Sequence, residues 1–188
     1  ALGDEAFRLA VLLTAAEMLR AGVTGALDHF AYAGRAEVAL AAHRETGMRI
    51  ALAPMLHDRP DHDLLNIALP GDLRRRVEGA KRPGPADLAF LFRHLRREWH
   101  GRDGRLFVQL GPNAPQRCSP ELWTLWRELA RELGLGAHTH LLETRPQAGI
   151  GRRLYDGGIV RAMAREGLLN ERLSVAHGIW TEPSERAL

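Results

Sequence analysis

Two histidines and one glutamate stand where apolar runs of this sequence end. Residues 137–144 read AHTHLLET, which places His140 at the end of a buried strand and Glu143 three residues later. Residues 173–180 read LSVAHGIW and bring His177 to the end of the next strand. Imidazoles that converge at the carboxyl ends of neighbouring parallel strands can hold a catalytic zinc ion. A free carboxylate beside them can move protons for a water that such an ion activates.

Helices and strands must alternate along the chain to position these residues. Ser119 as N-cap and Gly134 as helix stop predict a helix directly before the strand that carries His140. A helix that includes residues 159–166 precedes the strand that carries His177. Such alternation predicts a parallel sheet with right-handed crossovers, but periodicity alone does not separate an open doubly wound sheet from a barrel.

The remaining apolar patterns define the other elements. Helices are predicted over 4–20, 35–46, 86–99 and 119–133, and strands over 23–30, 48–56, 105–110, 136–142 and 173–179. Residues 181–185 predict the start of one more helix, and residues 57–85 predict a long irregular excursion rich in proline, glycine and arginine. We expect the strands over 48–56, 105–110 and 136–142 to be the most buried, because parallel sheets are covered on both faces.

Composition limits the partners that the protein can have. The 188 residues are 45% hydrophobic and 26% charged with a net charge of +3, and arginines interleave with acids along the predicted helices. This favours solvated helix faces over a nucleic-acid surface. The single cysteine, Cys118, excludes an internal disulfide and a cysteine-rich zinc site. Without an apolar run of about 18 residues or a signal-peptide pattern, we expect no membrane span and a cytoplasmic location.

Five stretches of the sequence together resemble one known family. They are EMLRAGVT at 17–24 with Asp28 and His29, GPNAPQRCS at 111–119, HTHLLET at 138–144, GLLN at 167–170 and LSVAHGIW at 173–180. In this order they are similar to the amidohydrolase superfamily, in its branch of guanine, 8-oxoguanine, cytosine and S-adenosylhomocysteine deaminases and triazine chlorohydrolases. No dinucleotide-binding fingerprint or P-loop competes with this interpretation.

The resemblance implies an α/β fold that is part of a distorted (β/α)₈ barrel, about its strands 2 to 6. The family's barrel is flanked by a β-sandwich that has no counterpart in this sequence, so residues 1–188 correspond to an incomplete metal-dependent hydrolase barrel domain. We expect the chain to be part of a longer protein, with a catalytically incompetent fragment as the alternative. The 188 residues alone are expected to be inactive.

The resemblance also implies a metal site. In the family a His-x-His pair after strand 1, one histidine each from strands 5 and 6 and an aspartate after strand 8 hold the ion. Carried over by motif, His140 and His177 are the ligands from strands 5 and 6, and Glu143 is the acid and base. The ion is one divalent metal, zinc in the first place and iron in the second. Because catalytic zinc usually has three protein ligands, we expect these two histidines alone to bind it weakly.

The implied reaction is hydrolysis of a C–N bond, most often deamination of a purine, a pyrimidine or a related heterocycle. A triazine-type chlorohydrolase is the alternative. His29, Gln116 and Trp180 are candidate contacts of the substrate, and His138 shares the face of His140 at a deeper position. The expected partner is a small heterocyclic molecule, and a homo-oligomer remains open.

Overall fold

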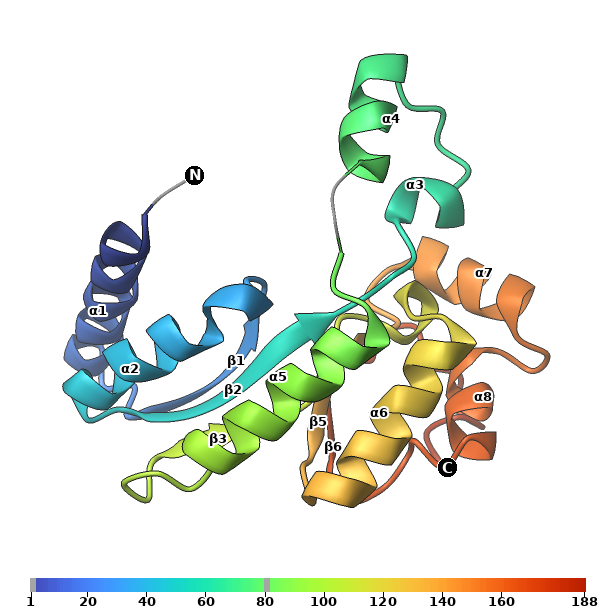
Figure 1. The fold of residues 1–188 in the computed structure, drawn as a ribbon. Coiled ribbons are helices and arrows are strands. Elements are labelled where there is room, and N and C mark those ends of the chain that lie inside the picture. Colours follow the sequence, from blue (N-terminus) through green and yellow to red (C-terminus); the bar gives the residue numbers. More distant parts are fainter. Residues whose placement is uncertain (1–2, 80–81) are drawn as a thin grey trace.

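The protein is a mixed α/β structure in which helices pack along a parallel sheet. A computed structural model describes residues 3–79 and 82–188 (Figure 1). Every pairing between its strands is parallel. The strands are β1 (Gly25–Phe30), β2 (Arg49–Leu56), β3 (Leu106–Val108), β4 (Gly111–Pro112), β5 (Ala137–Leu141) and β6 (Leu173–His177).

The strands lie side by side in the order of the chain. β1 pairs with β2, β2 pairs with both β3 and β4, and β5 pairs with β6. A parallel bridge between Leu110 and Ala137 joins the β3–β4 region to β5. In it the Leu110 amide donates to the Gly136 carbonyl at 2.9 Å, and the His138 amide donates to the Leu110 carbonyl at 2.8 Å. This order follows from crossovers that return each strand beside the one before it.

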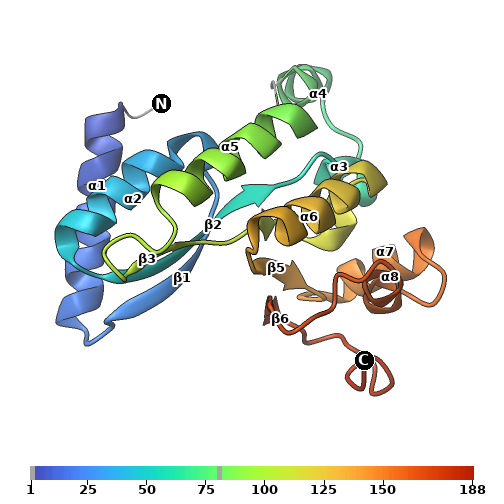
Figure 2. The ribbon, with the colours of Figure 1, turned by 60° about the horizontal axis from the view of Figure 1, so that its bottom comes forward.

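One helix precedes β1, and the others lie between successive strands. The helices are α1 (Asp4–Arg20), α2 (Ala36–Thr46), α3 (Asp61–Leu64), α4 (Gly71–Glu78), α5 (Pro85–Glu98), α6 (Pro120–Leu133), α7 (Arg145–Leu154) and α8 (Ile159–Arg165), with 3₁₀ helices η1 (Ala33–Arg35) and η2 (Pro115–Arg117). Helices α2, α5 and α6 lie along the same face of the strands (Figure 2). The Ser119 hydroxyl accepts a hydrogen bond from the Leu122 amide at the start of α6, and Gly134 ends this helix in the left-handed conformation. None of the described helices has the length and apolarity to cross a membrane.

The core lies between this face of the sheet and its helices. Leu40 of α2, Phe92 of α5 and Leu129 of α6 belong to one buried cluster with Leu52 and Val108 of the strands. Strands β2, β3 and β5 are more buried than β1 and β6, which confirms the burial expected from the sequence.

Side chains of β1 and β5 meet on the other face of the sheet, which shows that the sheet is strongly curved. The ring centre of His29 lies 4.5 Å from that of His140 and 5.0 Å from that of His138. In a flat sheet, strands three places apart would be separated by about 14 Å, at about 4.8 Å for each neighbour. The strands must therefore curl around the face that carries these histidines.

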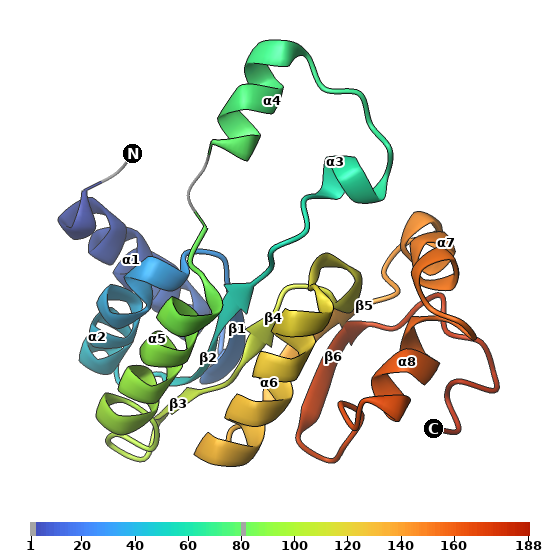
Figure 3. The same cartoon turned by 45° about the vertical axis from the view of Figure 1, so that its right-hand side comes forward.

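The first and last residues of the predicted strands, and of the helices predicted with both bounds, lie within two residues of the observed ones. Two other predictions are wrong. The excursion over residues 57–85 contains α3 and α4. α3 packs against η2, whereas α4 projects from the rest of the chain (Figure 3). Residues 80 and 81 of the excursion lie outside the described residues. α4 has no buried residue, so no apolar periodicity marked it. The helix expected from residue 181 is a set of turns, closed by a bond from the Glu185 amide to the Glu182 carbonyl.

Candidate active site at the carboxyl ends of the strands

Strand β5 presents two histidines on the concave face of the sheet. Ala137, Thr139 and Leu141 are buried, whereas His138 and His140 between them are partly exposed. This alternation is the ordinary pleat of a strand, whose successive side chains point to opposite faces. The histidines therefore face the hollow of the curved sheet, and His140 stands nearer the carboxyl end.

The ring of His140 is held in a form that leaves one nitrogen free for a ligand. Its Nδ1 lies 2.8 Å from the carbonyl oxygen of Asn113, directly after β4. A carbonyl can only accept, so Nδ1 carries a proton, and in the neutral imidazole this leaves the lone pair on Nε2. Metal-binding histidines typically donate their other ring N–H to a carbonyl or carboxylate in this way.

His177 reaches His140 because the backbone departs from strand geometry at this residue. The register pairs His177 with Leu141, which points toward the helices. His177 has φ 74°, a left-handed conformation that costs a non-glycine residue about 1 kcal/mol and more. Its ring centre lies 5.5 Å from that of His140, with 19° between the planes. Two imidazoles that share one zinc ion have ring centres roughly 5 Å apart, given N–Zn distances of about 2 Å.

Glu143 lies next to this pair on the short segment between β5 and α7. Its Oε1 is 3.7 Å from Nε2 of His177, and both side chains are partly exposed, 43% and 35%. Leu142 before it has φ 47°, so the chain turns in the left-handed region at this exit as well. Positive φ values in non-glycine residues cluster at functional sites, where the surrounding fold imposes them. The sequence-predicted set of His140, Glu143 and His177 is thus brought together at one rim.

His29 forms the floor beneath His140. Its ring stacks on that of His140 at 25°, and its Nε2 donates to the carbonyl oxygen of Gly111 at 3.3 Å. Burial, with a smaller contribution from His140 and His138, lowers the pKa of His29 to about 4, so the ring is neutral near pH 7. Burial also lowers the pKa of His138, whose Nδ1 lies 3.0 Å from the hydroxyl of Ser174.

The other two candidate substrate contacts follow β4 and β6, at the same end of the strands. Gln116 sits in η2 after β4 and is 3% exposed, so its side chain faces the interior. Trp180 follows β6 and is 45% exposed, and its amide donates to the Leu142 carbonyl at 3.0 Å.

Sequence reasoning missed two groups that hold the site residues. One is the backbone carbonyl of Asn113, and a backbone acceptor leaves no mark in a sequence. The other is Gln147 of α7, whose side chain contacts both the amide and the carboxylate of Glu143. The pattern from Thr144 to Gln147 fits a helix capping box and could have revealed the second group.

The donor atoms fit a metal ion in kind but are few in number. His140 offers a bare Nε2 and His177 an adjacent imidazole, the ligands that zinc and iron take in proteins. Across residues 3–79 and 82–188, no group of three or more histidine, cysteine, aspartate or glutamate side chains is arranged to hold a metal. A complete catalytic site therefore needs at least one further donor.

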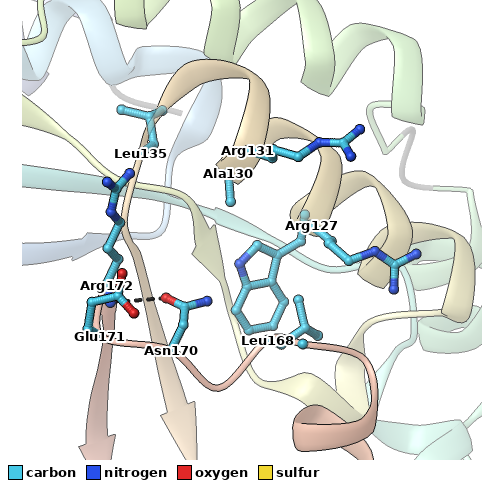
Figure 4. A pocket seen from close by; sticks show the side chains of 10 residues that line it. Arg127, Ala130, Arg131, Leu135, Leu168, Asn170, Glu171 and Arg172 are labelled. Carbon is cyan, nitrogen blue, oxygen red and sulfur yellow. Dashed lines mark hydrogen bonds between the residues drawn. The ribbon is translucent and has the colours of Figure 1, made fainter.

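A separate pocket lies at the opposite end of β5 and β6 (Figure 4). It is lined by Trp126 and Arg127 of α6, by Leu135 shortly before β5, and by Arg172 directly before β6. His140 and His177 stand at the carboxyl ends of these strands, whereas this pocket lies at their amino ends. The pocket therefore adds nothing to the candidate site.

Comparisons with known proteins identify relatives of this arrangement. The model of the amidohydrolase family matches residues 4–188. The chain is 30% identical over 173 residues to the 5-methylthioadenosine/S-adenosylhomocysteine deaminase of Moorella thermoacetica, a match that covers 92% of this chain and 35% of the relative. The chain thus spans about a third of that relative's length.

Solved structures share the fold at lower identity. A triazine hydrolase of Arthrobacter aurescens superposes with a TM-score of 0.81 at 19% identity, over 97% of this chain and 40% of the other. An adenosine deaminase of Xanthomonas campestris, solved with bound zinc, superposes with a TM-score of 0.79 at 22% identity, over 98% and 37%.

Proposed function

Because this chain belongs to the amidohydrolase family, we propose that it carries part of the active site of a metal-dependent hydrolase that deaminates a nitrogen heterocycle. The observation that carries the proposal is the meeting of His140, His177 and Glu143 at the ends of β5 and β6. The name of the Moorella relative supports an adenosine-type substrate. A small-molecule partner and a cytoplasmic setting complete the proposal.

The curved sheet is, in this proposal, strands 2 to 6 of a (β/α)₈ barrel. The contact between His29 and His138 supports it, because only a sheet on its way to closure brings β1 and β5 together. Residues 1–188 are then an incomplete barrel domain. The remaining strands would complete the rim and supply the missing metal ligands.

One divalent ion, zinc before iron, would be held by His140 through Nε2 and by His177. When bound, such an ion polarises a water and lowers its pKa toward neutrality. Two imidazoles are fewer than a catalytic zinc site requires, so the two histidines alone should bind zinc weakly. In calorimetric titration with zinc chloride, His140→Ala should abolish the weak binding, whereas His94→Ala, on α5 where the ring pairs with Glu37, should leave it unchanged.

Glu143 performs the proton transfers in this proposal. Its carboxylate takes a proton from the attacking water as the C–O bond forms, and returns it to the amino group as the C–N bond breaks, which releases ammonia. The neutral ring of His29 and the side chains of Gln116 and Trp180 are the proposed contacts of the heterocycle.

Glu143→Gln tests this role, with Glu128→Gln on the exposed face of α6 as the matched control. We expect Glu143→Gln to lower kcat for ammonia release from S-adenosylhomocysteine or 5-methylthioadenosine by roughly 10²- to 10⁴-fold, the usual contribution of a general acid and base. The zinc content should stay the same. Full turnover in Glu143→Gln would show that another group moves the proton.

Two alternatives remain in competition. A triazine-type chlorohydrolase would expel chloride and need less proton donation, so release of chloride rather than ammonia identifies it. A catalytically incompetent fragment is the other, and the intact mass decides it: a mass near 20.9 kDa supports the fragment, and a much larger one supports a longer enzyme.

A further inference from the structure

The start of helix α7 has an unusual cap. Thr144 is the N-cap, and its hydroxyl accepts from the amide of Gln147 at 3.4 Å. In an ordinary capping box the side chain of the third helical residue reaches back to the amide of the N-cap. Here Oε1 of Gln147 accepts from the amide of Glu143 at 2.8 Å, one residue earlier. The cap is therefore built onto the residue that carries the proposed acid and base.

The second half of the Gln147 amide faces the carboxylate of Glu143. Its Nε2 donates to Oε2 at 3.4 Å, while Oε1 of the same carboxylate faces His177 at 3.7 Å. The two oxygens thus have different neighbours. A primary amide is the side-chain group that accepts from a backbone N–H and donates to a carboxylate at the same time.

We propose that Gln147 is a positioning residue that fixes the side chain of Glu143 with Oε1 toward His177. The functional meaning of this rests on the proposed role of Glu143 in proton transfer. A glutamate that is 43% exposed would otherwise sample several rotamers, and only some of them point at the histidines. We call the two contacts of Gln147 with Glu143 the Gln147 clamp.

The rival explanation is that Gln147 only caps a helix. Thr144→Ala separates the two, because it removes the hydroxyl cap and leaves both contacts of the clamp in place. Gln147→Met keeps the length and helix propensity of the side chain but removes its donor and acceptor. Arg145→Ala, in the same turn and exposed, is the control for an unrelated change at this helix end.

Amide hydrogen exchange of Glu143, followed by NMR on labelled protein, tests the clamp without any enzymatic assay. Gln147→Met should speed exchange at Glu143 roughly fivefold to tenfold, as expected for one lost hydrogen bond. Arg145→Ala and Thr144→Ala should change it little. Unaltered exchange in Gln147→Met would overturn the proposal.

The kinetic test uses the same variants in the active enzyme. Gln147→Met should lower kcat by up to roughly 100-fold with KM and zinc content unchanged, since misplacing a catalytic group by about 1 Å has effects of this size. Thr144→Ala should destabilise the protein similarly but keep kcat. Equal kcat in both variants would reduce Gln147 to a cap and overturn its positioning role. If the exchange results hold but no form of the protein deaminates any heterocycle, the clamp stands and the proposed function fails.

Discussion

Gly111 takes part both in the packing of the sheet and in the candidate site. It pairs with Met55 in the short β4–β2 ladder, and its carbonyl accepts from Nε2 of His29. A Cβ added to Gly111 would lie 2.4 Å from the carbonyl oxygen of Pro54 and 2.5 Å from that of Ala53. Ordinary carbon–oxygen contacts begin at about 3.3 Å, so one strand must move by roughly 1 Å.

Gly111→Ala should therefore destabilise the protein and disturb the floor of the site. Both obstructing atoms are backbone atoms of buried β2, which cannot rotate away as a side chain would. Overpacking of this kind costs about 2 kcal/mol, which for a chain of this size lowers Tm by roughly 4–8 °C. The shift should also lengthen the contact between the Gly111 carbonyl and His29.

Gly149→Ala is the matched control, because it makes the same chemical change in an exposed turn of α7 where no atom lies within 4 Å of the new Cβ. Alanine should raise stability there by about 0.5–1 kcal/mol, as in any open helix interior. Urea unfolding followed by circular dichroism measures both, as midpoints at an unchanged slope. A midpoint for Gly111→Ala equal to that of the parent would refute the close approach of β4 to β2.

Two further predictions follow from backbone strain and burial. His177→Gly should be more stable to heat than His177→Ala by about 1 kcal/mol, because φ 74° suits glycine; equal melting temperatures would contradict the left-handed geometry. The pKa of His29 is about 4 in the folded protein and near 6.5 in the unfolded chain, so the unfolded chain binds the extra proton between these values. The contribution of His29 to stability is thus complete above about pH 6.5, is lost as the pH falls toward 4, and changes no further below that. In urea titrations at pH 7 and pH 4.5, the parent should lose more stability on acidification than His29→Gln, and equal losses would show that His29 is not buried as a neutral ring.

The sequence predicted most of the elements that have a buried face, although it did not predict α7, which buries Ala148 and Ile150. The strand that carries His140 was predictable because Ser119 and Gly134 bound the helix before it and the apolar run of β5 follows at once. Convergence of His140 and His177 followed from the rule that parallel strands end at one edge of the sheet. Helix α4 was missed for the converse reason, since a helix without a buried residue leaves no apolar period to detect.

The arrangement of the site itself depends on backbone features that side-chain patterns do not encode. Strict alternation along β6 would send His177 to the helix face with its neighbour in register, Leu141. The left-handed residues Leu142 and His177 break that alternation at the exits of two adjacent strands, and they turn Glu143 and His177 toward the same space. Leucine rarely adopts this conformation, and histidine, although it does so more often than most residues, still pays a steric cost there, so the fold must impose it at both positions. The strain is therefore located where the geometry of the proposed chemistry is set, which is the pattern expected if it serves the site rather than the stability of the sheet.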